Sequence, residues 1–171
     1  MKTFVRPFIL TISLIVLSLF SFGQNNGNDY GPVCLDFQKN NCTYSENKYY
    51  QYNDASRSAL FVKGQTSKMP LEIFNGRDYR ISICNEEALG DTIEIKLIDE
   101  ETEDVLYCNA DNNYSKIFEF TVFESRTIFI EITVPGNTGI EKQIHGVLPK
   151  NRKTGCVGVL IEHMITPVKG F

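Results

Sequence analysis

Apolar and polar residues alternate with a period of two through most of the sequence after residue 57, and this pattern constrains the fold more than any other feature. Ile93, Ile95 and Leu97, for example, are separated by the charged Glu94 and Lys96. Successive side chains of an extended strand point to opposite faces, so such a segment turns one face to a core and the other to water. The pattern therefore predicts antiparallel strands that cover a hydrophobic core.

Turn-forming residues divide this region into separate strands. Asn75-Gly76 lies between two apolar runs and predicts a tight hairpin, and turn residues at 111–113 and 135–137 interrupt later runs. The predicted strands are 58–63, 69–74, 78–84, 92–98, 104–108, 116–123, 126–134 and 156–165, with 141–148 uncertain. No long segment after the N-terminus has helical periodicity, so seven or eight strands joined by short turns predict an all-β sandwich.

The N-terminus has the features of a cleaved secretory signal. Lys2 and Arg6 precede an apolar run at 8–20, and small residues occupy the −3 and −1 positions before Gln24. The run has 13 residues, whereas a spanning helix needs about 20. We therefore expect export to the periplasm or the extracellular space, with no stable membrane span after cleavage.

This signal sets the expected domain organisation and charge. The signal peptide is 1–23, an irregular N-terminal segment is 24–57, and the β-sandwich domain is 58–171. Without Lys2 and Arg6, 15 basic and 21 acidic side chains remain, which is a net charge of −6. A mildly acidic surface disfavours nucleic acid and anionic membranes as partners.

Five cysteines follow the predicted cleavage site: Cys34, Cys42, Cys84, Cys108 and Cys156. Export permits disulfides, and the odd number leaves one thiol free or paired between molecules. If 78–84, 92–98 and 104–108 formed a meander, Cys84 and Cys108 would lie two strands apart, about 9.5 Å. That distance exceeds the usable Cα separation of about 7 Å. We therefore predict Cys34–Cys42 and Cys84–Cys156 bridges, with Cys108 as the free thiol.

A family resemblance rests on an ordered set of short motifs. The stretches GRDYRISIC, IKLIDEET, VLYCNADNN, IFEFTVFESRTIFIEITV and GCVGVLIEHM follow one another between about residues 58 and 165. In this order they resemble the bacterial pre-peptidase C-terminal domain, and the last stretch also resembles the end of uncharacterised exported bacterial proteins. The resemblance implies an antiparallel, jelly-roll-like β-sandwich of 7–9 strands with an accessory or binding role, not catalysis.

Two groups of residues could bind a metal. The acidic turn with Asp99, Glu101, Glu103 and Asp104 could supply several of the six to eight oxygens that calcium needs. Its other interpretation is a solvated turn that discourages edge pairing. His145, His163 and Cys156 could form a three-ligand site, although their spacing matches no ligand pattern. We expect no cofactor, with calcium as the alternative.

Four tyrosines gather in the N-terminal segment: Tyr44, Tyr49, Tyr50 and Tyr52. They could form a binding platform for a protein or a glycan, or they could cover one side of the sandwich. The sequence carries no catalytic motif, so we expect no catalytic residues. The predicted function is an exported, non-enzymatic protein that binds an unknown envelope protein or glycan. The alternative is a metal-dependent (Zn or Ca) secreted hydrolase or metal-binding module.

Overall fold

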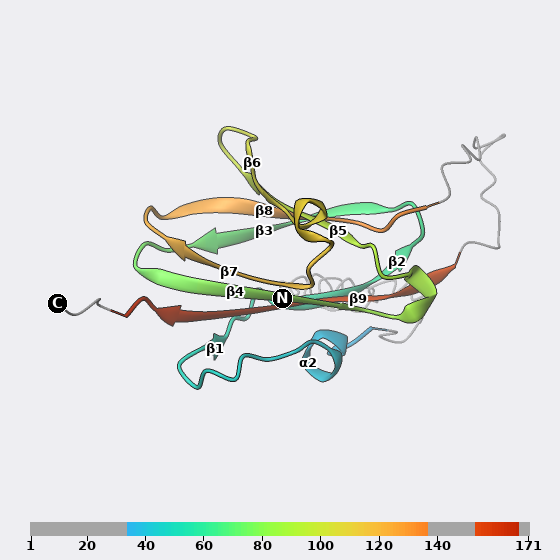
Figure 1. Cartoon of the computed structure of the whole chain (residues 1–171), viewed down its shortest axis with the longest axis horizontal. Coiled ribbons are helices and arrows are strands. Elements are labelled where there is room, and N and C mark those ends of the chain that lie inside the picture. Colours follow the sequence, from blue (N-terminus) through green and yellow to red (C-terminus); the bar gives the residue numbers. More distant parts are fainter. Residues whose placement is uncertain (1–33, 137–152, 168–171) are drawn as a thin grey trace, which may run out of the picture. The chain divides into compact units, whose positions relative to one another are not determined.

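The strands of the described residues form two antiparallel sheets that pack face to face (Figure 1). The computed structural model describes residues 34–136 and 153–167, all within one compact unit, Pro32–Phe171. The elements are α2 (Phe37–Asn41), β1 (Gln51–Tyr52), β2 (Arg57–Val62), β3 (Thr66–Ile73), β4 (Arg77–Asn85), β5 (Glu94–Asp99), β6 (Val105–Cys108), β7 (Ile117–Val122), β8 (Arg126–Thr133) and β9 (Thr154–Ile165). The predicted signal, its cleavage site, residues 141–148 and His145 lie outside the described residues.

The order of the strands is that of a jelly roll. One sheet runs β2-β9-β4-β7, with the short β1 also paired to β9, and the other runs β3-β8-β5-β6. The chain crosses repeatedly from one sheet to the other, as in double-sheet jelly rolls. The prediction of an all-β antiparallel sandwich is therefore confirmed, and the eight predicted strands after residue 57 are present within a few residues of their expected limits.

The predicted pairing of neighbouring strands is wrong in two places. The turn at Asn75-Gly76 reverses the chain, but β3 pairs with β8 and β4 pairs with β9 and β7. Strands β4, β5 and β6 likewise form no meander, because β4 lies in one sheet and β5 and β6 in the other. A turn motif specifies a reversal of direction, whereas burial of the apolar faces decides which strands pair.

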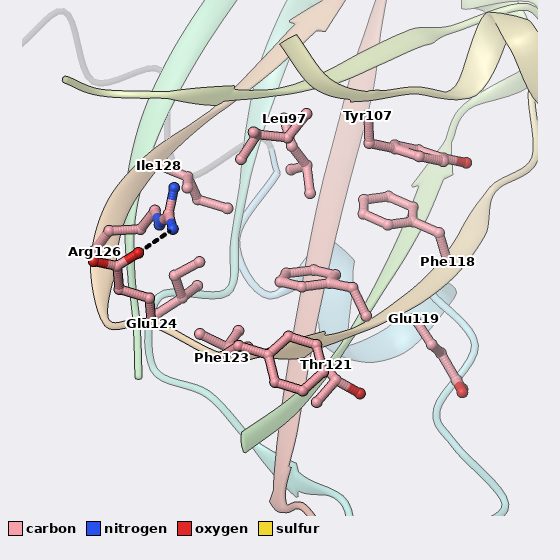
Figure 2. A pocket seen from close by; sticks show the side chains of 13 residues that line it. Leu97, Tyr107, Phe118, Glu119, Thr121, Phe123, Glu124, Arg126 and Ile128 are labelled. Carbon is pink, nitrogen blue, oxygen red and sulfur yellow. Dashed lines mark hydrogen bonds and ion pairs between the residues drawn. The ribbon is translucent and has the colours of Figure 1, made fainter. Parts of the chain in front are cut away.

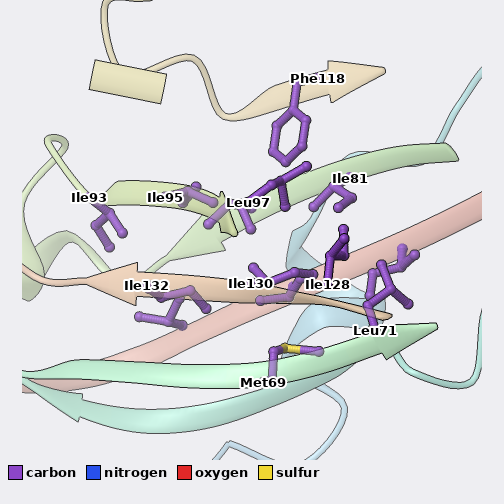
Figure 3. Close-up of a cluster of buried hydrophobic side chains, with 14 of the residues drawn as sticks. Met69, Leu71, Ile81, Ile93, Ile95, Leu97, Phe118, Ile128, Ile130 and Ile132 are labelled. Carbon is purple, nitrogen blue, oxygen red and sulfur yellow. The ribbon is translucent and has the colours of Figure 1, made fainter. Parts of the chain in front are cut away.

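The inner faces of the two sheets form one hydrophobic core (Figure 3). Every second residue of β3 and β8 is buried there: Met69, Leu71, Ile73, Ile128, Ile130 and Ile132. On β5, Ile95 is buried while Glu94 and Lys96 on the other face form an ion pair. The period-two pattern therefore gave the correct inward face of these strands.

The outer face of the β9–β4 sheet is also buried, because the N-terminal segment covers it (Figure 1). This segment, predicted to be irregular, contains α2 and β1. Gly158 of β9 allows the close approach of α2: a Cβ atom there would lie 2.8 Å from the Cα of Gln38. The continuous apolar run of β9 thus reflects a strand that is buried on both faces.

Two disulfides hold this segment on the sheet, and their pairing differs from the prediction. Cys34 bonds to Cys156 of β9 and Cys42 bonds to Cys84 of β4, while Cys108 is a free thiol. The predicted Cys34–Cys42 and Cys84–Cys156 bridges are therefore wrong. The physical reason is that the segment lies across the neighbouring strands β9 and β4, so that each of its cysteines is placed against a strand cysteine.

Candidate functional site

A groove of about 610 Å³ opens between β6 and β7, the edge strands of the two sheets (Figure 2). We call it the edge groove. Its lining consists of Ile73, Leu97, Leu106, Tyr107, Phe118, Glu119, Phe120, Thr121, Val122, Phe123, Glu124, Arg126 and Ile128. Most of these side chains are apolar, so the interior of the sandwich is accessible from this side.

Stacked aromatic rings form one wall of the edge groove. The ring of Tyr107 on β6 stacks on Phe118 of β7 with 4.5 Å between centroids. Phe118 and Phe120 are 6.3 Å apart, and Phe120 stacks on Tyr79 of β4 at 5.6 Å. These separations lie in the range of favourable aromatic pairs, so the wall is a continuous and rigid apolar surface that links the two sheets.

One polar atom in this wall has no partner. The hydroxyl oxygen of Tyr107 is buried, and no described residue forms a hydrogen bond with it. A buried hydroxyl normally has a partner, because desolvation without one costs about 1–3 kcal/mol. The Tyr107 hydroxyl is therefore a buried polar group without a partner among the described residues, on a ring that forms part of the groove wall.

The rim of the edge groove exposes large apolar side chains. Phe123, directly after β7, is 84% exposed. Leu106 on β6, which also lines the groove, is 50% exposed. Exposed apolar groups are common when they are scattered, but a group that surrounds an apolar groove marks an interaction site.

One end of the edge groove is acidic. Arg126 pairs with Asp99 at 2.9 Å and with Glu124 at 2.8 Å. The hydrogen bond that Arg126 donates to Asp99 is the main cause that lowers the pKa of Asp99. A shallow recess beside it is lined by Asp99, Glu100, Glu101, Thr102, Glu124, Ser125, Arg126 and Thr127. Four carboxylates and one guanidinium thus line this recess, so this end of the groove favours a positively charged partner.

The structure does not assemble the predicted calcium ligands. Asp99 is buried, accepts hydrogen bonds from the amides of Glu101 and Thr102, and pairs with Arg126. Glu101, Glu103 and Asp104 are exposed. Among residues 34–136 and 153–167, no three His, Cys, Asp or Glu side chains are placed to hold a metal. Cys156 is in a disulfide, so it is not a thiolate ligand beside His163.

The predicted tyrosine platform is divided between different environments. Tyr44 and Tyr49 are exposed, whereas Tyr52, on β1 of the N-terminal segment, packs against Cys42, Cys84 and Leu160. Tyr50 is partly buried, and this burial, followed by the charge of Glu119, raises its pKa to about 12. The four rings therefore form no single surface.

Tyr49 belongs instead to a second cavity of about 620 Å³ at the far end of β9. His163, Met164 and Arg77 also line this cavity. The His163 ring lies 6.0 Å from that of Tyr79, and its pKa is lowered, first by burial and then by the charge of Arg77. Burial and the charge of Arg77 thus both disfavour the charged form of His163.

The sequence contains one indication of the edge groove, a set of apolar residues that do not follow the period-two pattern. Val105, Leu106 and Tyr107 are consecutive apolar residues in a short strand, and the apolar Phe123 directly follows β7. Consecutive exposed apolar residues break the pattern that a soluble edge strand needs. The sequence could indicate this departure, but only the pairing of the sheets shows that both places meet at one groove.

No protein-family model matches the chain, and no curated protein matches it in sequence. Among solved structures, it is similar to Aeromonas hydrophila PliG, a periplasmic lysozyme inhibitor of g-type lysozyme. That match has 7% sequence identity and a TM-score of 0.44, and it covers 71% of this chain and 92% of PliG. No helix among the described residues is long and apolar enough to cross a membrane.

Proposed function

We propose that this chain is an exported, non-enzymatic binding protein whose edge groove receives an apolar segment of a partner protein. The predicted signal and the two disulfides support export, because stable disulfides form in oxidising compartments. The observation that carries the proposal is the groove itself, an open site whose lining is mainly apolar and includes the polar Glu124 and Arg126. Binding sites commonly combine apolar walls with a few polar groups in this way.

A protein partner suits this groove better than a glycan does. Sugars need several hydrogen-bonding side chains in addition to a ring on which to stack. In the edge groove, the side chains of Arg126, Glu124 and Glu119 already have charged partners within the fold. The remaining wall is mainly apolar, which matches aliphatic or aromatic side chains of a partner.

Binding of a neutral apolar fluorophore tests the proposed site. We expect N-phenyl-1-naphthylamine to bind the exported protein saturably, and Phe123→Asp to weaken binding at least about fivefold by removing apolar contact area. Phe123 is almost fully exposed, so this change should leave the fold intact. Leu35→Asp is the matched control, because Leu35 is also an exposed apolar residue but does not line the groove. The absence of saturable binding, or equal binding by both variants, would reject the site.

A further inference from the structure

We propose that the partner segment binds as an extended strand added to the free edge of β7, with alternate apolar side chains in the edge groove and basic side chains outside it. This inference rests on the proposed function of the edge groove. It adds the conformation of the partner segment and the chemistry of its side chains. Recognition by strand addition uses main-chain hydrogen bonds for affinity and side-chain pockets for selectivity.

The backbone of β7 has hydrogen-bonding groups available for such a strand. One edge of β7 pairs with β4 within the sheet, where Phe118 lies opposite Ile81 and Phe120 lies opposite Tyr79. The amide of Ile83 donates to the carbonyl of Lys116 at 2.8 Å. Because backbone groups alternate in direction along an antiparallel strand, residues 116, 118 and 120 face β4, and residues 117, 119 and 121 face the free edge.

Two of these three edge residues are unpaired. Ile117 is occupied locally: its amide donates to the hydroxyl of Ser115, and that hydroxyl donates to the Ile117 carbonyl. No described strand pairs with the free edge at Glu119 and Thr121. Their N–H and C=O groups therefore offer two donors and two acceptors at the mouth of an apolar groove.

The edge strand β3, on the opposite side of the sandwich, carries residues that discourage pairing with another strand. Strand β3, which forms that edge of its sheet, carries Lys68 and Pro70. Lysine and proline are residue types that discourage pairing with another chain. Strand β7 has no proline, and the exposed Phe123 follows it. The sequence thus blocks pairing at one edge and leaves it open at the other.

Side-chain positions define the pattern that an added strand would need. An added strand lies about 4.8 Å from β7, and its side chains alternate between the two faces of the sheet. On the inner face they would meet Phe118, Phe120 and Tyr107, which favours aliphatic or aromatic residues. On the outer face Glu119 already pairs with Arg80, and the acidic recess that Glu100 and Glu101 line lies at the end of the groove. The carboxylates of Glu100 and Glu101 favour lysine or arginine there.

A synthetic peptide, Lys-Val-Lys-Phe-Lys-Val-Lys, is the probe for this mode of binding. For a strand added antiparallel to β7, the amides of the two internal lysines face β7 when valine and phenylalanine point into the groove. We expect N-methylation of those two amides to weaken binding at least about tenfold, because it removes the main-chain donors. N-methylation of the phenylalanine and the following valine blocks only the outward edge and should leave the affinity unchanged.

A protein variant provides the reciprocal test. Thr121→Pro removes an N–H that faces the free edge and leaves the hydrogen bonds to β4 in place. Because Thr121 also lines the groove, the reference variant is Thr121→Val, which keeps this N–H. We expect Thr121→Pro to bind the peptide at least about tenfold more weakly than Thr121→Val does. If the naphthylamine binds but the peptide does not, or if both methylated peptides bind equally, strand addition is rejected while the proposed site stands. If neither probe binds, the proposed site is rejected as well.

Discussion

At the scale of single residues, a buried ion pair lies beneath the N-terminal segment. Arg80 and Glu162, on the outer face of the β4–β9 sheet, are 2.6 Å apart and almost fully buried. Glu162 also accepts hydrogen bonds from the amide of Ser45, and Arg80 donates to the carbonyl of Thr43. The pair therefore connects the sheet to its cover, a role that the alternation in the sequence does not predict, because it would assign both side chains to solvent.

Loss of one partner should be costly. Glu162→Ala would leave Arg80 buried without this carboxylate and should lower the free energy of unfolding by about 3–5 kcal/mol. Glu119→Ala is the control, because Glu119 also pairs with Arg80 but is more than half exposed, and its loss should cost less than about 1 kcal/mol. Urea denaturation of both variants measures the difference, and equal costs would show that the buried pair does not hold the cover.

His163 should make stability depend on pH in a defined direction. Burial and Arg77 lower its pKa in the folded chain, so the unfolded chain binds this proton more readily. The free energy of unfolding should therefore fall as the pH drops from the unfolded value of about 6.5 through the folded pKa. Chemical denaturation at several pH values between about 5 and 7.5 covers this window. The free energy of unfolding should depend less steeply on pH in His163→Gln than in the unchanged protein. An identical slope in both proteins would contradict the assignment.

At the scale of elements, the sequence predicts strand positions well and strand partners poorly. Local alternation decides which residues of β5 or β8 face the core, and this information lies within each segment. Pairing depends on contacts between segments far apart in the chain, such as β4 with β9. For the same reason the cysteine pairing could not be predicted, because it depends on where the N-terminal segment lies on the sheet.

The disulfides give this element-scale description a direct check. Non-reducing peptide mapping of exported protein should yield Cys34–Cys156 and Cys42–Cys84 peptides, with Cys108 available for alkylation. The bridges span 122 and 42 residues, and in the chain-entropy model each closure stabilises the fold by about 4–5 kcal/mol. A Cys34–Cys42 peptide would contradict the position of the N-terminal segment.

At the scale of the sandwich, the edge strands on its two sides carry different kinds of residues. One side has Lys68 and Pro70 on β3, and the other has an aromatic wall, an unpartnered Tyr107 hydroxyl and exposed apolar groups around an open groove. The apolar run at 105–107 was visible in the sequence, but its position opposite β7 follows only from the jelly-roll order. This asymmetry is the basis of the proposed binding function.

The most direct test of that function is a titration of ¹⁵N-labelled exported protein with N-phenyl-1-naphthylamine, followed by amide chemical shifts. The edge groove predicts saturable changes at Tyr107, Phe118 and Phe123, which line it. Amides that line the second cavity, such as Tyr49 and Met164, should not shift. Changes centred on Tyr49 and Met164, or no saturable change at Tyr107 and Phe118, would contradict the account.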